Sequence, residues 1–289
     1  MIDLFSLMII AICLISLIFG SITDLKTREV PDWLNFTLIA AGILIRSMYS
    51  IITWSYEPLL FGILGLILGV AIALLMFYTG QWGGGDSKML MGLGALLGFD
   101  LTFSSLLISF IFAVIFIGAI YGFIWTFILA LKNWKKFKKQ FHAYMHTPLH
   151  FKIRITSFTI SFALLIIMFL FIKSIKTRLL LLVLIITYYI LMYLYIFIKT
   201  IEEICMIKFI STSKLTEGDW IVDEVKVGKK TVASSKDLGI SHEQILKIKQ
   251  SGIKKVKIKE GIPFLPSFLL SFIFVLVFGN IVELLVSLI

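Results

Sequence analysis

Two acidic residues, Asp24 and Asp86, lie at the edges of long apolar segments, and Asp86 directly follows Gly83, Gly84 and Gly85. A carboxylate at the edge of such a segment is costly unless it has a partner or a function. Two neighbouring carboxyls can hydrolyse an amide: the ionised one takes a proton from water, and the neutral one polarises the carbonyl and protonates the leaving amine. Like charges at short range keep one proton on the pair. The residue types of Asp24 and Asp86 therefore predict a catalytic pair.

The glycines near Asp86 have a physical role in this hypothesis. Without side chains, the three that precede it let the backbone turn sharply and let an extended peptide lie close to the acid. Gly94 and Gly98 follow in a Gly-x-x-x-Gly pattern, which favours close packing of a second helix. We expect that packing to bring the first apolar segment, and with it Asp24, beside Asp86.

Each acid alone also has a simpler interpretation. Asp86 follows glycines at the start of a helical segment, where an aspartate is a favoured N-cap. Asp24 is close to Lys26 and Arg28 and could be an interfacial acid in a surface ion pair. Asp32 is expected to be only the N-cap of the second apolar helix. The catalytic interpretation is favoured because a separate charge argument places Asp24 and Asp86 on the same membrane face.

The composition requires a membrane protein. Of the 289 residues, 59% are hydrophobic and only 15% are charged, whereas a soluble domain needs roughly a quarter charged residues. The net charge of +10 comes from lysines in a few loops, which indicates topology signals and contacts with anionic headgroups rather than nucleic acid. Cys13 and Cys205 provide neither a disulfide framework nor a Cys-x-x-Cys metal site.

Apolar runs of about 20 residues identify the expected membrane spans. A further segment, Ser87–Gly98, is short and begins with polar residues, so we expect a helix buried among the others. Together they predict an all-α polytopic membrane protein with about eight transmembrane helices. The first run is interpreted as a retained span rather than a cleaved signal peptide. The predicted spans are Leu4–Ile22, Leu34–Ile52, Pro58–Thr79, Leu101–Leu131, Ile155–Ile172, Leu179–Ile198 and Phe264–Ile289.

Basic loops predict the orientation. The cluster Lys135–Lys139 is expected in the cytoplasm, because cytoplasmic loops carry an excess of lysine and arginine. Counting spans backward places Gly83–Lys88 and Asp24–Arg28 on the same side, so the predicted site faces the cytoplasm. One conflict remains, because the same count places the basic turn Lys173–Arg178 outside.

The segment Glu202–Gly261 has soluble character and predicts a small cytoplasmic α+β module before the last helix. Alternating residues predict strands, and the pattern that begins at Ser241 is a capping box. The expected elements are a hairpin of Val222–Val227 and Thr231–Ala233 with a turn at Gly228, a helix from Ser241 to Gly252, and a strand at Ile253–Ile258.

These elements predict a division of the chain into four parts. Residues 1–131 form a membrane catalytic core with both aspartates, and residues 132–202 form a basic cytoplasmic loop with an additional helical hairpin. Residues 203–262 form the α+β module, and residues 263–289 form the C-terminal transmembrane helix.

The order of motifs resembles a known family. The run from Asp24 to Leu34, which includes Pro31, follows one span, and the run from Gly83 to Lys88 opens a later helix. This arrangement is similar to that of the archaeal preflagellin and prepilin peptidases, which are Gly-x-Gly-Asp membrane aspartyl proteases related to the type IV prepilin peptidases. The resemblance is close over roughly Leu4–Gly98. The Pro-rich run at residues 262–266 also looks like the archaeal members.

The resemblance implies a function. Asp24 and Asp86 match the two catalytic aspartates, and Gly83 and Gly85 match the motif glycines. The family removes short basic leader peptides from pilin-like or archaellin precursors at the cytoplasmic membrane face. The zinc-binding Cys-x-x-Cys pairs of bacterial members are missing here, so N-methylation of the product is not expected. No metal or other cofactor is expected.

Other residues are candidates for the approach of the substrate. They include Lys88, beside Asp86, and Glu29, whose charge could attract a basic leader; Pro263 and Pro266 begin the last span. Lys88 could instead anchor the chain at the interface. His142, His146 and His150 are spaced as on one helix face, but Pro148 interrupts that helix, so interfacial histidines are favoured over a metal site.

Two alternatives stay open. A presenilin-like intramembrane protease also has Gly-x-Gly-Asp, but no Pro-Ala-Leu motif lies near the last span. A non-enzymatic transporter or scaffold would place acids near the bilayer midplane and use inverted repeats. We detect neither feature in the sequence.

Overall fold

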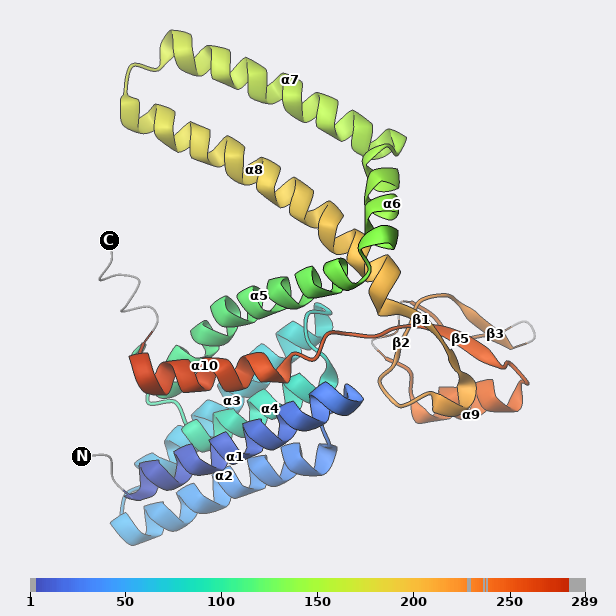
Figure 1. Ribbon diagram of the computed structural model, residues 1–289. Coiled ribbons are helices and arrows are strands. Elements are labelled where there is room, and N and C mark those ends of the chain that lie inside the picture. Colours follow the sequence, from blue (N-terminus) through green and yellow to red (C-terminus); the bar gives the residue numbers. More distant parts are fainter. Residues whose placement is uncertain (1–3, 228–229, 236, 238, 281–289) are drawn as a thin grey trace. The chain divides into compact units, whose positions relative to one another are not determined.

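The computed structural model describes residues 4–227, 230–235, 237 and 239–280 (Figure 1). The chain divides into two compact units. Unit 1 comprises Met1–Trp125 and Phe209–Ile289, and unit 2 comprises Thr126–Lys208.

Six helices in the described ranges are long and apolar enough to cross a membrane. Shorter helices are α4 (Gly84–Leu97), at the predicted Ser87–Gly98 segment, and the apolar α10 (Leu265–Phe278). The prediction of a polytopic helical membrane protein is confirmed; residues 281–289 of the last predicted span lie outside the described residues. The six are α1 (Leu4–Thr27), α2 (Asp32–Thr53), α3 (Glu57–Tyr78), α5 (Leu106–Lys132), α7 (Pro148–Phe171) and α8 (Ile175–Ile201).

Two predictions at the starts of helices are wrong. The span expected from Leu101 begins at Leu106, because the Asp100 carboxylate accepts the Thr102 N–H (3.1 Å) and hydroxyl (2.7 Å) and holds a turn. Asp32 is not an N-cap: it is the first residue of α2, and its carboxylate forms an ion pair instead of capping the helix.

Helix α4 lies at the centre of unit 1. Its side chains Met89, Leu90, Leu93 and Leu96 are fully buried, which is why so short a helix can exist inside a membrane bundle. Helices α1, α2 and α3 pack against it (Figure 1).

The Gly94–Gly98 pattern mediates close packing, but not with the expected partner. A Cβ at Gly94 would collide with the carbonyl of Gly65 on α3, and one at Gly98 would collide with the Arg46 guanidinium from α2. The expectation that these glycines bring the first span alongside is therefore wrong. α1 contacts α4 elsewhere, where a Cβ on Gly20 would come within 3.2 Å of Met89 Cε.

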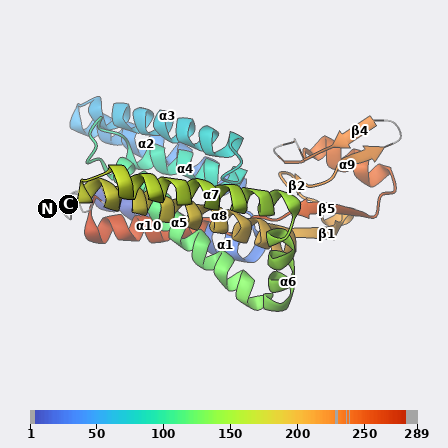
Figure 2. The same cartoon turned by 90° about the horizontal axis from the view of Figure 1, so that it is seen from above.

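The soluble module combines two small sheets with one helix. Strands β1 (Ile207–Ser211), β5 (Lys255–Lys259) and β2 (Trp220–Ile221) form a sheet in that order, with β2 antiparallel to β5. Strands β3 (Val225–Val227) and β4 (Lys230–Ala233) form an antiparallel hairpin, as predicted. Helix α9 closes the module, and Figure 2 shows it from a second direction.

The prediction of a small strand module is confirmed, with shifts in its boundaries. Helix α9 (His242–Gln250) begins with the predicted capping box between Ser241 and Gln244. The first expected strand is split, because Val222 donates its N–H to the Lys257 carbonyl and the chain then turns away before the hairpin. The turn predicted at Gly228 lies outside the described residues.

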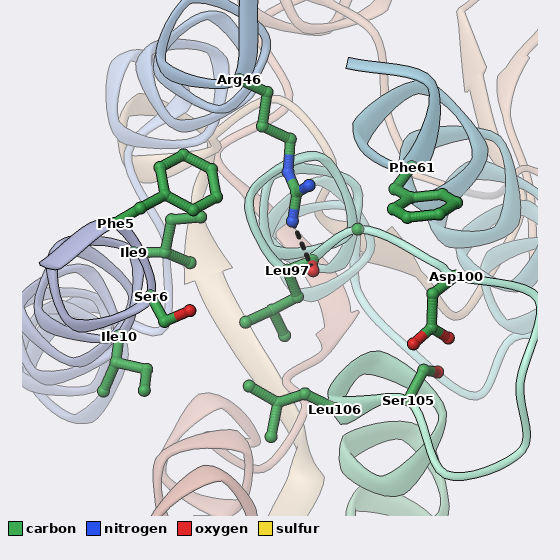
Figure 3. A pocket seen from close by; sticks show the side chains of 11 residues that line it. Phe5, Ser6, Ile9, Ile10, Arg46, Phe61, Leu97, Asp100, Ser105 and Leu106 are labelled. Carbon is green, nitrogen blue, oxygen red and sulfur yellow. Dashed lines mark hydrogen bonds between the residues drawn. The ribbon is translucent and has the colours of Figure 1, made fainter. Parts of the chain in front are cut away.

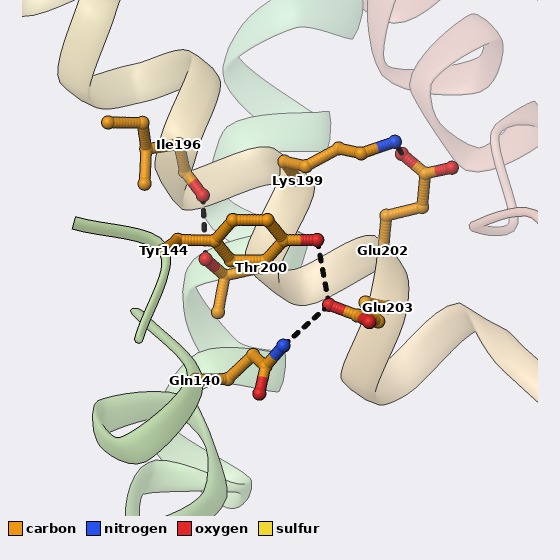
Figure 4. Close-up of polar contacts among 7 residues, drawn as sticks. All are labelled: Gln140, Tyr144, Ile196, Lys199, Thr200, Glu202 and Glu203. Atoms are coloured by element: carbon orange, nitrogen blue, oxygen red, sulfur yellow. Dashed lines mark hydrogen bonds and ion pairs between the residues drawn. The ribbon is translucent and has the colours of Figure 1, made fainter. Parts of the chain in front are cut away.

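Unit 2 contains the end of α5, the short helix α6 (Trp134–Met145), and an antiparallel hairpin of α7 and α8 (Figures 1 and 2). The basic segment expected as a loop is thus largely helical. Helix α6 ends before Pro148, as predicted. The carboxylate of Glu203, in the π-helical turn η1 (Glu202–Met206), accepts hydrogen bonds from Gln140 Nε2 and the Tyr144 hydroxyl, each 2.8 Å long (Figure 4). These bonds join α6 to the end of α8.

Candidate active site

Asp24 lies in the last turn of α1 and is only 6% exposed. One carboxylate oxygen accepts the backbone N–H of Leu265 at 2.9 Å, and the N–H of Phe264 also donates to this carboxylate. These amides open α10, where Phe264, the N-cap, provides no side-chain bond of its own. Because the first amides of a helix lack partners within it, Asp24 acts as the missing cap of α10.

The proline-rich run leads directly to this contact. Pro263 is buried just before the two donating amides, and Pro266 occupies the first turn of α10. Proline is favoured there because its missing N–H would have no helical partner. Both prolines therefore lie at the start of the helix that Asp24 caps.

Asp86 lies in the first turn of α4, behind the N-cap Gly83. The N–H of Gly83 donates to the Asp86 carboxylate, and Ser87 donates its N–H to the Gly83 carbonyl at 3.1 Å. Interpreting Asp86 as the N-cap is therefore wrong. Its carboxylate reaches back to the N-cap amide, as the third residue of a capping box does, and the side chain remains partly exposed.

The structure brings the two acids together. The charge of Asp24 acts on the Asp86 carboxyl, although the two belong to different helices. The segments that hold them also touch: the Trp82 ring, in the loop before α4, lies 6.0 Å from the Phe264 ring at the start of α10. Two interacting carboxyls at the end of an apolar bundle can share a proton, which is the state that general acid–base hydrolysis requires.

The three glycines differ in their surroundings. A Cβ on Gly85 would come within 3.0 Å of Val30, so a side chain at this position would press against Val30. A Cβ on Gly83 would meet only the Asp86 Oδ2, at 3.6 Å, and one on Gly84 only Phe77, at 3.9 Å. Gly85 thus serves packing, while Gly83 and Gly84 leave the surface beside the carboxylate open.

Lys88 and Glu29 do not join the acids directly. Lys88 Nζ binds Asp32 Oδ1 at 2.6 Å and lies 5.5 Å from the centre of the Phe36 ring. Glu29 is exposed in the loop after α1, and its charge acts on Asp219 of the soluble module. Lys88 therefore links α4 to α2, and Glu29 lies in the short loop that follows Asp24.

Residues of α5 near Asp24 were missed by the sequence argument. The charges of Asp24 and Arg28 both act on the Tyr121 phenol, and the Arg28 guanidinium lies 5.4 Å from the centre of the Trp125 ring. Arg28 Nη1 and the Tyr121 hydroxyl are buried and have no hydrogen-bond partner among the described residues. Arg28 also has a positive φ of 62°. An aromatic residue in an apolar span gives no sequence signal that its side chain lies beside an acid.

The site residues provide no recognisable metal centre. Among the described residues, no three His, Cys, Asp or Glu side chains are grouped so that they could hold a metal ion. In unit 2, His142 and His146 stack with ring centres 4.1 Å apart.

Comparison with known proteins identifies relatives of the part that carries both aspartates. Residues 11–123 match the profile of the type IV leader peptidase family. The preflagellin peptidase of Methanococcus voltae is 38% identical over 87 residues, which are 30% of this chain and 37% of that protein. The preflagellin peptidase of Methanocaldococcus jannaschii is 36% identical over 83 residues, 29% of this chain and 35% of that protein.

The resemblance predicted from the motifs is thus confirmed for this part of the chain. The matched range includes both Asp24 and Asp86. The matches span little more than a third of each of these relatives. The soluble module and unit 2 lie outside the range that the family profile matches.

Proposed function

We propose that this protein is a membrane aspartic endopeptidase that removes short leader peptides from preflagellin-like or pilin-like precursors. The observation that carries the proposal is the pairing of Asp24 and Asp86 at one end of the apolar bundle, within the segment that resembles leader peptidases. Relatives that share this segment are preflagellin peptidases, which supports the choice of substrate.

The surroundings of the two acids assign their roles in the proposal. Two backbone N–H groups donate to Asp24, and such bonds stabilise a carboxylate. Asp24 is therefore the ionised partner, and Asp86 holds the shared proton. Asp24 takes a proton from water as the water oxygen bonds to the scissile carbonyl carbon, and Asp86 protonates the carbonyl oxygen. When the C–N bond breaks, Asp24 passes its proton to the amine nitrogen, and Asp86 takes back a proton from a hydroxyl of the tetrahedral intermediate.

The neighbouring groups fit the approach of an extended peptide. The open surface at Gly83 and Gly84 lets the substrate backbone lie against Asp86. Arg28 and Tyr121 offer buried polar atoms on the Asp24 side. Glu29 is exposed and negative, which suits a basic leader.

The proposal places the site at the cytoplasmic membrane face. Helix α6 carries the exposed lysines Lys135, Lys136, Lys138 and Lys139 between two membrane spans. Basic segments between spans favour the cytoplasmic side and anionic headgroups. The short connections of unit 1 then put the Asp24 loop and the loop before Asp86 on that side.

Cleavage of a preflagellin-like precursor in membranes tests the proposal. Asp24→Asn and Asp86→Asn, each made singly, should reduce cleavage by several orders of magnitude, because neither amide can exchange the required proton. Asp223→Asn is the matched control: it removes an exposed acid in the soluble module that forms an ion pair with Lys257 at 3.5 Å. Cleavage at the wild-type rate by either catalytic variant would overturn the proposal.

A further inference from the structure

A buried arginine is bound to the opposite end of the helix that carries Asp86. Arg46, on α2, is 6% exposed. Its Nε and Nη2 donate to the Leu96 carbonyl at 3.0 and 2.8 Å. Nη2 also donates to the Leu97 carbonyl at 2.6 Å (Figure 3). A charge inside an apolar bundle is costly and indicates a function.

The acceptors show what this charge does. Leu96 and Leu97 end α4, where the last carbonyls of a helix lack partners and carry partial negative charge. Nη1 donates to the Pro58 carbonyl of α3 at 2.9 Å, so the guanidinium joins three helices. Two glycines make room for it, because a Cβ on Gly62 or Gly98 would collide with the Arg46 side chain.

Glycines on α2 and α3 bring these helices close to α4, beside the apolar side chains that also pack there. A Cβ on Gly42 of α2 would come within 2.8 Å of the Ala95 backbone, and Gly65 of α3 lies directly against Gly94. Small residues let the helices approach closely, but they provide little interdigitation against sliding. Polar bonds at the two ends of α4 therefore add directional contacts that help to fix its axial position.

Both of those ends are bound to α2. Arg46 binds the carbonyl end, and Asp32 binds Lys88 near the other end, two residues after Asp86. The same helix α2 follows Asp24 after a short loop. Asp86 precedes Leu96 by about 15 Å of helix at 1.5 Å per residue, so an axial shift of α4 moves the acid by the same amount.

We propose that Arg46 is a positioning residue. By binding the C-terminal carbonyls of α4, it fixes the axial position of this helix and thereby the position of Asp86 relative to Asp24. This inference rests on the proposed function for its effect on cleavage. It concerns a residue that touches neither the substrate nor the carboxyls. A displacement of about 1 Å at a catalytic group can cost about a hundredfold in rate.

Arg46→Ala with and without added guanidinium tests the inference. A cavity of about 290 Å³, lined by Phe5, Ser6, Arg46 and Ser105 among others, adjoins the guanidinium and can admit a small cation (Figure 3). We expect kcat to fall about a hundredfold with KM little changed, and sub-denaturing guanidinium, but not ammonium, to restore it. Arg46→Lys should be only partly active, because it cannot make the same set of bonds.

The pH profile separates positioning from loss of folded protein. Coupling between two close acids separates their apparent pKa values and widens the pH range of the singly protonated pair. Displacement of Asp86 should therefore narrow the pH–rate profile. Arg28 and Tyr121 keep their positions beside Asp24 in this variant, so these two groups do not account for the change. A smaller folded fraction would lower the profile without narrowing it.

Arg178→Ala provides a matched control. In unit 2, Arg178 Nε binds the Ile172 carbonyl at 2.6 Å and Nη2 binds the Phe169 carbonyl at 3.3 Å, so it also binds a helix C-terminus. Its loss should change neither kcat nor the width of the profile. Equal effects of the two substitutions, or an Arg46→Ala enzyme with wild-type kcat and profile, would overturn the inference.

A distance measurement decides the question without cleavage. Spin labels at Thr27, exposed at the end of α1, and at Gly84, where a side chain has room, report the separation of α1 from the start of α4. In a Cys205→Ser background, Arg46→Ala should shift or broaden this distance, and guanidinium should restore it. An unchanged distance would overturn the inference, whereas a wild-type enzyme that cleaves no precursor would overturn only the proposed function.

Discussion

The carboxylate of Asp24 accepts the backbone N–H of Leu265, 241 positions later in the chain, at a distance of 2.9 Å. The first membrane helix thereby provides the cap that α10 lacks. One side chain has two tasks: it holds the start of α10 and, in the proposed mechanism, activates water. Substitutions can separate these tasks.

Asp24→Ala and Asp24→Asn should differ in stability although both abolish cleavage. The asparagine keeps an acceptor for the amides of Phe264 and Leu265, whereas alanine leaves them buried without one. An unsatisfied buried donor costs about 1–3 kcal/mol, so the alanine variant should have the lower free energy of unfolding by about that amount. Chemical unfolding in detergent measures it, and equal stabilities would show that the cap contributes nothing.

Gly20→Ala should impair cleavage, because the new methyl group has no room beside Leu265 and Met89. A Cβ at Gly20 would collide with the Leu265 side chain and approach Met89 Cε to 3.2 Å, so it would displace the start of α10 and the helix of Asp86. We expect a ten- to hundredfold lower kcat, on the order of what small misplacements cost. Glycine to alanine within a helix otherwise stabilises it.

The double variant Gly20→Ala with Leu265→Ala checks this interpretation. Removing the Leu265 side chain frees the space that the new methyl group needs. Part of the lost kcat should return, and a double variant less active than Gly20→Ala would show that the collision is not the cause.

Tyr121→Phe should lower cleavage and leave stability equal or higher. The hydroxyl is buried beside Asp24 without a partner among the described residues, and such a group costs free energy in the folded state. If it donates to the substrate carbonyl, its loss should cost about a hundredfold in kcat. Kinetics and unfolding of the same samples test both statements. Tyr78→Phe, at an exposed position, should alter neither quantity.

Asp219 should make the stability of the soluble module depend on pH. Burial, together with the charges of Glu29 and Glu260, raises the pKa of this half-buried acid, although the Thr216 N–H donates to it at 2.9 Å. Its contribution to stability is therefore complete at a pH below its pKa in the unfolded chain, about 4. This contribution is lost as the pH rises through the pKa in the folded protein.

Asp219→Asn keeps the acceptor for Thr216 but removes the charge. Hydrogen exchange of module amides should show the variant to be more stable than the wild type near neutral pH, with the difference vanishing in acid. Asp223→Asn provides the baseline for an exposed acid in the same module. A difference that does not depend on pH would contradict the assignment.

Sequence patterns predicted the features that depend on local chemistry. Apolar length predicted the spans, the Ser241–Gln244 spacing predicted the start of α9, and the chemistry of paired acids singled out Asp24 and Asp86. The first two of these signals lie within a few residues of the feature that they predict. The same patterns placed Leu101 in a helix, because they did not weigh the turn that the Asp100 side chain holds.

Long-range partners were not predictable in this way. Any residue except proline has a main-chain N–H, so nothing marks Leu265 as a donor to Asp24. Arg46 stands out as a charge in an apolar run, but the sequence does not say that its acceptors are the carbonyls of α4. Gly94 indicated close packing correctly, yet a small residue does not specify its neighbour, and the neighbour is Gly65.

The bond between Asp24 and the start of α10 also orders events during biosynthesis. Asp24 and Asp86 are translated early, but the amides of Phe264 and Leu265 appear only after unit 2 and the soluble module have been made. Until α10 enters the membrane, Asp24 lacks the donors that hold it in place and favour its charge. In the proposed mechanism, the protease therefore becomes competent only late in its own synthesis.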